Sequence, residues 1–91
     1  MPQYVMIMTG LESSGDWGAY IDKLADLGKL RGGSSLANGV RISKGGVDSG
    51  TTVSGYIRLE AADADEARSL LIGNPLYEAG GVVELLEEVP D

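Results

Sequence analysis

The residues of this chain that could carry out chemistry are limited, because the sequence contains neither histidine nor cysteine. Histidine is the side chain whose ordinary pKa lies nearest neutrality, and it is the commonest general base and metal ligand. Without cysteine there is no thiol nucleophile, no disulfide and no Cys-based zinc site. Any acid–base step must therefore use a carboxylate, a tyrosine or a lysine with a shifted pKa.

The charge of the chain argues against several classes of partner. Fourteen acidic and seven basic residues give a net charge of −7, which repels phosphate backbones. The pairs Gly32-Gly33 and Gly45-Gly46 lack the spacing and the following helix of a phosphate-binding loop. The sequence therefore predicts no nucleic-acid partner, no metal and no nucleotide cofactor.

Two charged residues are candidates for contact with a ligand. Arg41 lies on a predicted strand, where an inward-facing guanidinium could hold a carboxylate, although an outward, solvated arginine is commoner. Asp48 lies in a glycine-rich segment, where the favoured interpretation is a turn residue that bonds its own backbone. The alternative for Asp48 is a carboxylate at the mouth of a pocket.

Three aromatic residues could stack on a ligand. Trp17 lies on the apolar face of a predicted helix, so a core or interface position is the favoured interpretation and ligand stacking the alternative. Tyr56 and Tyr77 are interpreted as packing residues whose hydroxyl groups reach solvent.

The first half of the chain predicts a strand, a helix and two short strands. Residues 4–8 are continuously apolar, which is typical of a central strand. Asp16 is an expected N-cap for a helix over 16–27, closed by Gly28. Strands are expected over 30–36 and 40–43, with a turn at Asn38-Gly39.

The second half predicts a loop, a strand, a helix and a closing strand. The segment 44–50 is the most loop-like of the chain, and 51–60 has the longest strand signal. Asp63 and Glu66 resemble a capping box for a helix over 63–72. After Gly73 we expect a short ordered loop and a strand from Val82 onward. The order β-α-β-β-α-β predicts a single ferredoxin-like α+β domain over residues 1–91, with an antiparallel sheet and two helices on one face.

The first strand is apolar on both of its faces. Tyr4, Met6 and Met8 fall on one side, and Val5 and Ile7 on the other. Because an exposed apolar sheet face would aggregate, we expect a homodimer formed through the face that the helices leave open. The same segment is too short to span a bilayer and lacks the features of a secretory signal, so a cytoplasmic protein without a membrane partner is expected.

The order of these elements resembles the YCII-related family, which includes the DGPF-motif proteins. The similarity lies in the opening strand, the glycine-rich segment 28–33, the Gly55-Tyr56-Ile57 strand, the Asp63 helix start and the loop 73–81. The resemblance implies a dimeric α+β barrel built from ferredoxin-like subunits. It also implies a histidine at or next to Trp17 and an aspartate at Asn74, both of which are replaced here. Of the DGPF motif only Asp48 and a nearby glycine remain.

Three functions stay open at this point. The first is a dimeric small-molecule-binding domain that lacks the family's acid–base pair, with a pocket between the sheet and the first helix lined by Trp17 and Tyr56. The second is a cofactor-independent enzyme, such as a lactone isomerase, dehalogenase or oxygenase, in which Arg41, Asp48 or Asn74 orients the substrate. The third is a structural or regulatory partner domain. We expect Asn74 and Tyr77 to lie at the same pocket, beside the start of the first helix.

Overall fold

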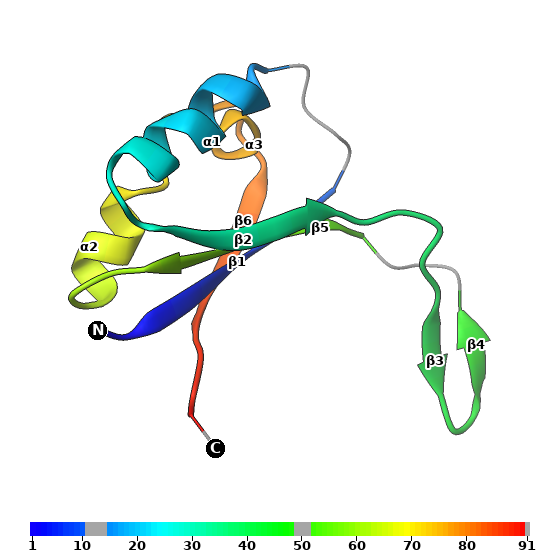
Figure 1. Ribbon diagram of the computed structural model, residues 1–91. Helices are drawn as coiled ribbons and strands as arrows, with labels where there is room; N and C mark the ends of the chain where they lie inside the picture. Colours follow the sequence, from blue (N-terminus) through cyan, green and yellow to red (C-terminus); the bar gives the residue numbers. More distant parts are fainter. Residues whose placement is uncertain (11–14, 49–51, 91) are drawn as a thin grey trace.

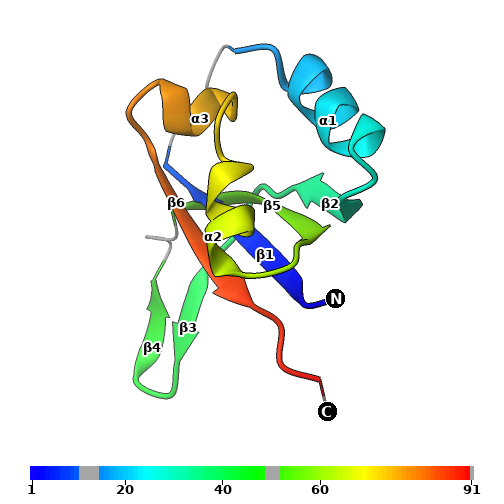
Figure 2. The ribbon, with the colours of Figure 1, turned by 90° about the vertical axis from the view of Figure 1, so that its left-hand side faces the viewer.

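The computed structural model describes residues 1–10, 15–48 and 52–90, which form one sheet, three helices and a projecting hairpin (Figure 1). The main sheet is antiparallel with strand order β2-β5-β1-β6. Its strands are β1 (Gln3–Thr9), β2 (Leu30–Ser35), β5 (Val53–Glu60) and β6 (Val82–Glu87). The helices are α1 (Trp17–Asp26), α2 (Ala64–Ser69) and α3 (Pro75–Glu78). Figure 2 shows all three on one side of the sheet, which confirms the ferredoxin-like α+β prediction.

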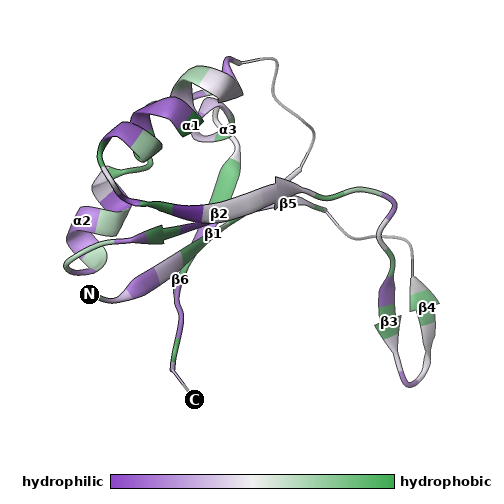
Figure 3. Cartoon of the chain, viewed as in Figure 1, coloured by the Kyte–Doolittle hydropathy of each residue, from purple (hydrophilic) through white to green (hydrophobic). Residues whose placement is uncertain are grey.

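The core lies between the central strands and the helices. Tyr4, Met6 and Met8 of β1 are buried on the side that faces the helices, and Met6 pairs with Ile57 of β5 and Leu85 of β6. Residues directly opposite each other in antiparallel strands share a face, so these pairs form one apolar layer. Figure 3 shows hydrophobic residues recurring along β1 and β5. The predicted division of the first strand into two faces is confirmed, because Val5 and Ile7 are only half-buried on the other side.

Helix α1 begins and ends where its sequence predicts. The Asp16 carboxylate accepts a hydrogen bond of 2.9 Å from the Ala19 N–H, and Gly28 follows the helix in the left-handed region at φ +72°. Tyr20 and Leu24 are the buried residues of this helix. The Tyr20 hydroxyl donates a bond of 2.7 Å to the Leu70 carbonyl and so fastens α1 to the end of α2.

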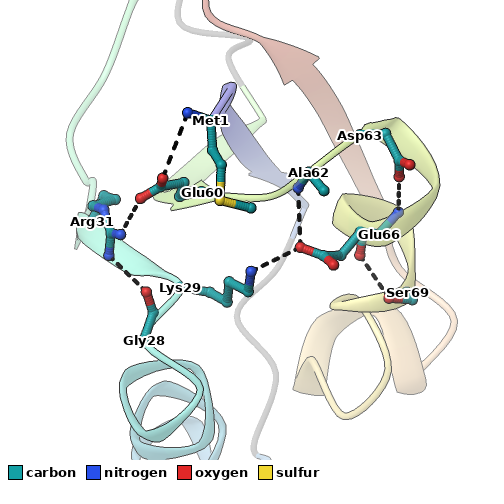
Figure 4. A network of polar contacts seen from close by, with 9 residues as sticks. All are labelled: Met1, Gly28, Lys29, Arg31, Glu60, Ala62, Asp63, Glu66 and Ser69. Atoms are coloured by element: carbon teal, nitrogen blue, oxygen red, sulfur yellow. Dashed lines mark hydrogen bonds and ion pairs between the residues drawn. The ribbon is translucent and has the colours of Figure 1, made fainter.

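The start of α2 is tied to the beginning of β2 by a polar network (Figure 4). The Glu66 N–H donates to the Asp63 carboxylate at 2.8 Å, as the capping-box prediction requires. The reciprocal bond differs, because Glu66 Oε1 accepts from the Ala62 N–H at 3.1 Å instead of from the cap residue itself. Lys29 Nζ lies 2.9 Å from the same Glu66 oxygen, and Arg31 pairs with Glu60 beside it.

One prediction for the middle of the chain is wrong. The segment expected to be a loop over 44–50 instead contributes to a hairpin of β3 (Arg41–Ser43) and β4 (Gly46–Asp48), which turns at residues 44–45. Gly46 has φ +154°, which glycine alone adopts readily, and the β-branched Ile42 and Val47 are cross-strand partners. Around Asn38, where the sequence predicts a hairpin or a bent edge, the chain bends with φ +59°, and β2 and β3 are not register partners. Residues 49–51 of the predicted loop and strand lie outside the described residues.

The segment after Gly73 also differs from its prediction. The expected ordered loop contains the short helix α3, for which Pro75 occupies the first turn and Asn74 is the N-cap. Proline suits this position because its fixed φ is helical and its missing N–H would have had no partner inside the helix. Among the described helices of the chain, none is long and apolar enough to cross a membrane.

We expect Tyr20→Phe to lower the free energy of unfolding at pH 7 by about 1–3 kcal/mol, because the buried Leu70 carbonyl loses its donor. Burial raises the pKa of Tyr20 to about 12, with the neighbouring Asn74 side chain opposing part of the rise. The contribution of Tyr20 to the free energy of unfolding is therefore complete below pH 10 and is lost as the pH rises toward 12. Urea unfolding should show the wild-type advantage shrinking over that range. Tyr77→Phe, at an exposed tyrosine, is the control, and an equal loss there would contradict the assignment.

The pKa of Glu66 is lowered by the Lys29 ammonium first and by the Ala62 N–H second. Lys29→Met should raise this pKa toward its ordinary value, as measured by NMR titration of the side-chain carboxyl. A lowered carboxyl pKa stabilises the folded state above its unfolded pKa, so the stability difference between wild type and variant should close as the medium is acidified. Arg58→Met is the control, since it should raise only the pKa of Glu88. A Glu66 pKa that ignores Lys29 would contradict the pairing.

Candidate functional site

A pocket of about 630 Å³ lies between α1 and the sheet edge made by β2 and β5. The lining residues come from β1, α1, β2 with the segment after it, β5 and α3, and they are mostly apolar or small: Met8, Trp17, Ile21, Leu30, Gly32, Gly33, Ser34, Ser35, Leu36, Ala37, Ser54, Gly55, Tyr56, Ile57 and Leu76. Its volume falls within the usual range for small-molecule sites, roughly 300–1,000 Å³.

The pocket exists because β2 has almost no side chains where α1 passes over it. The sequence of residues 32–35 is Gly-Gly-Ser-Ser, and Gly33 has φ +159°. A Cβ atom on Gly33 would lie 2.6 Å from the Tyr56 carbonyl oxygen, so no larger residue fits there without moving the backbone. A Cβ atom on Gly55, which pairs with Ser35, would lie 3.1 Å from the Ser34 carbonyl oxygen.

Trp17 forms the helix side of the pocket. It is the first residue of α1 and is half-buried, and its ring meets Tyr20 edge to face with centroids 6.3 Å apart. This geometry is one that aromatic pairs prefer, so Tyr20 in the core fixes the orientation of the indole at the pocket. Trp17 therefore combines the two interpretations that the sequence left open, since it packs on the core and also lines a cavity.

The polar groups of the pocket are hydroxyls. The lining includes the hydroxyl-bearing residues Ser34, Ser35, Ser54 and Tyr56. In the strand register Ser35 pairs with Gly55 on the face toward α1, whereas Ser34 pairs with Tyr56, and Tyr56 with Ile7, on the opposite face. No aspartate, glutamate, lysine or arginine is among the described lining residues. The described residues also contain no group of three or more carboxylates placed to hold a metal ion. Such a pocket can stack on a ligand and hydrogen-bond to it, but its lining offers no group that titrates near neutrality.

Asn74 is not among the described residues that line the pocket, but it caps the helix α3, which contributes Leu76 to the lining. Its side chain is completely buried, and Oδ1 accepts from the N–H groups of Leu76 at 3.0 Å and Tyr77 at 3.1 Å. Its Nδ2 lies near Tyr20 but has no hydrogen-bond partner among the described residues. Asn74 is thus the cap that places Leu76 at the pocket, while Tyr77 is 47% exposed on α3 and is not a lining residue.

Arg41 and Asp48 lie elsewhere. They are register partners on the β3–β4 hairpin, which projects away from α1 (Figure 1), and Arg41 is not among the described lining residues. Of the candidate residues, the structure brings together Trp17 and Tyr56 in one pocket and leaves the others outside it. Reasoning from sequence missed the backbone of residues 32–35. A run of small residues on a strand expected to pair near an amphipathic helix is the signal that could have revealed it.

A second, shallower depression of about 590 Å³ lies between the start of α1 and the segment 73–79. Its polar side chains are engaged in bonds within the protein. Lys23 Nζ donates to the Ile72 carbonyl at 2.8 Å, and the Glu78 carboxylate accepts from the Gly73 N–H at 3.1 Å. Neither Asn74 nor Tyr77 lines it. The structure therefore separates the three residues: Trp17 lines the larger pocket, Asn74 is completely buried, and Tyr77 is exposed on α3.

The combination of a four-stranded antiparallel sheet, helices on one face and a pocket beneath the first helix defines a ferredoxin-like α+β subunit of the type that forms dimeric α+β barrels. A solved structure with this fold is the 5-chloro-2-hydroxyhydroquinone dehydrochlorinase (TftG) of Burkholderia phenoliruptrix AC1100, in complex with 2,5-dihydroxybenzoquinone. The TM-score is 0.59 with 16% sequence identity, over 98% of this chain and 93% of that one. This similarity shows the fold alone.

Comparison by sequence gives no family for this chain. No family model matches it, and no curated protein matches it. The resemblance to the YCII-related family therefore stays a prediction, and so do the roles that it implies for Trp17, Asp48 and Asn74.

Proposed function

We propose that this protein binds a small, flat organic molecule in the pocket between α1 and the β2–β5 edge. The observation that carries the proposal is a cavity of about 630 Å³ whose helix side is formed by the indole of Trp17. An aromatic ligand gains affinity from contact with the indole face or edge. The Ser35 hydroxyl, on the face toward α1, can orient the polar substituents of such a ligand.

Binding without acid–base catalysis is the function that the lining supports. The described lining residues supply hydroxyls and apolar surface, and the positions at which the resemblance implies a histidine and an aspartate are Trp17 and Asn74. A tryptophan and an asparagine cannot move protons efficiently near neutral pH. Discrimination between ligands then depends mainly on shape.

A cofactor-independent enzyme is the second candidate function. The solved protein with the same fold is named for removing chlorine from a hydroquinone and was captured with a dihydroxybenzoquinone. This favours quinones and hydroquinones as the first probes for the present pocket. Because Tyr56 pairs with Ile7 and Ser34 on the face of the sheet away from α1, any turnover by this chain would have to use the substrate's own ionisable groups.

We also propose that two copies associate through the sheet face opposite the helices. On that face Val5 lies beside Leu86, and Ile7 lies beside Tyr56, in the register of the strands. Leu86 is 53% exposed, and Val5, Ile7 and Tyr56 are half-buried. A second copy would cover this apolar stripe, in keeping with the limited core of a chain of 91 residues.

Ser35→Phe should block ligand binding by filling the pocket. Ser35 is exposed and pairs with Gly55 on the face toward α1, so a phenyl group there occupies the cavity without entering the core. We expect at least a tenfold loss of affinity, on the order of 1.4 kcal/mol, for 2,5-dihydroxybenzoquinone. Quenching of Trp17, the single tryptophan of the chain, together with calorimetry measures the binding.

Ser69→Phe is the matched control, because Ser69 is an exposed serine at the end of α2 outside the pocket. Both variants should unfold at nearly the wild-type urea concentration. Equal binding by wild type and Ser35→Phe, or no saturable binding of any flat phenol or quinone, would overturn the proposal. Saturable chloride release from 5-chloro-2-hydroxyhydroquinone would establish the enzymatic alternative instead.

Sedimentation velocity should find a dimer at micromolar concentration and neutral pH. Ile7→Asp places a carboxylate at the centre of the apolar stripe and should dissociate that dimer, because a buried charge without a partner is strongly unfavourable. Ile72→Asp, at a residue 62% exposed on the helix side, should leave the dimer intact. A wild-type monomer under these conditions would refute association through this face.

A further inference from the structure

The β3–β4 hairpin projects from the body of the molecule, on the side of the sheet away from the helices (Figures 1 and 2). Each strand has three residues, and the cross-strand partners Ile42 and Val47 are 73% and 69% exposed. Figure 3 shows hydrophobic segments on both strands of the hairpin. An isolated two-stranded hairpin is at best marginally stable in water, so this one gains from a surface to pack against.

The charge of the hairpin indicates what kind of surface that is. The charged residues from Arg41 to Asp48 are Arg41, Lys44 and Asp48, so the hairpin carries a net +1 in a chain whose net charge is −7. A basic arm on an acidic protein is complementary to another copy of the same chain.

The exposed residues of β6 match the hairpin in both apolar and charged character. Val82 and Leu86 are 64% and 53% exposed, and they alternate with the exposed Glu84 on the face that the helices leave open. The pair Ile42 and Val47 could cover Val82 and Leu86, which would bring Lys44, in the turn of the hairpin, near the Glu84 carboxylate.

The topology allows these two elements to meet between copies. The strand order β2-β5-β1-β6 places β6 at the edge opposite β2, and the hairpin connects β2 to β5. If two sheets face each other around a two-fold axis that runs along the strands, the β2 edge of one copy lies across from β6 of the other. The contact then occurs twice, as two-fold symmetry requires.

We propose that the β3–β4 hairpin is a dimerisation arm that packs Ile42 and Val47 against β6 of a second copy and brings the Lys44 turn near Glu84. The inference rests on the homodimer proposed above and adds the element that holds it.

Cross-linking tests the contact directly, because the chain has no cysteine of its own. Protein carrying Ile42→Cys is mixed with protein carrying Leu86→Cys, and the mixture is oxidised. We expect a disulfide-linked heterodimer at several times the yield obtained when Ile42→Cys is mixed with Ile72→Cys. Ile72 is the matched control because it is similarly exposed and lies on the helix side.

The two proposals fail in different ways. A wild-type dimer whose 42–86 cross-link is no more frequent than the 42–72 control overturns the arm but leaves the dimer standing. A wild-type monomer overturns both proposals.

A second measurement covers the case in which cysteines disturb the contact. Ile42→Asp combined with Val47→Asp should weaken the dimer about 100-fold by sedimentation equilibrium, since two exposed apolar anchors are lost. Ile72→Asp should leave the dissociation constant unchanged, and circular dichroism should show all variants folded. An unchanged dissociation constant in the double variant would overturn the arm.

Discussion

The pocket depends on a mismatch between a helix that is held in place and a strand that has no side chains to fill the space beneath it. Protein interiors are normally close-packed, and a helix over Gly32-Gly33-Ser34-Ser35 would be expected to move toward the strand until the space closed. Two long-range hydrogen bonds oppose that movement on the other side of α1. Tyr20 bonds to the Leu70 carbonyl and Lys23 to the Ile72 carbonyl, so the helix is fastened to the segment after α2.

The same arrangement explains why Trp17 and Leu76 lie at the pocket. Trp17 is positioned by the Asp16 cap behind it and by its edge-to-face contact with Tyr20. Leu76 is positioned by Asn74, whose carboxamide oxygen orders the first turn of α3. A Cβ atom on Gly81 would lie 2.5 Å from the Leu76 side chain, so the chain after α3 also packs closely against it. The pocket is therefore preformed by contacts of residues that do not themselves line it.

The sequence predicted the regular elements well, because their signals are local. Asp16 and Asp63 cap the two main helices as expected, and the alternation in β1 and β5 reports burial directly. Strand β4 was missed because it has three residues and lies in a segment rich in glycine, and α3 was missed because a four-residue helix has no periodicity to detect.

The candidate site was harder to predict, because it depends on which elements come together in space. Trp17 and Tyr56 meet at one pocket only through the pairing of β2 with β5 beneath α1. Asn74 was expected at the pocket on the strength of a family resemblance, whereas its hydrogen bonds are those of a helix cap. The identity of a residue at a position known from a family does not show whether its side chain lines a cavity or bonds to the neighbouring backbone.

The placement of charge gives the final constraint on function. Among the described residues, ion pairs join Lys29 to Glu66, Arg31 to Glu60, Arg58 to Glu88 and the Met1 amino group to Glu60. The pocket contains none of these residues, so a ligand there meets a neutral lining. With a neutral lining, no charged side chain has to be desolvated when a ligand binds, and no long-range electrostatic attraction draws a charged ligand to the pocket. In the proposed binding function, selection would then follow from the fit of a flat molecule between the indole and the bare backbone of β2.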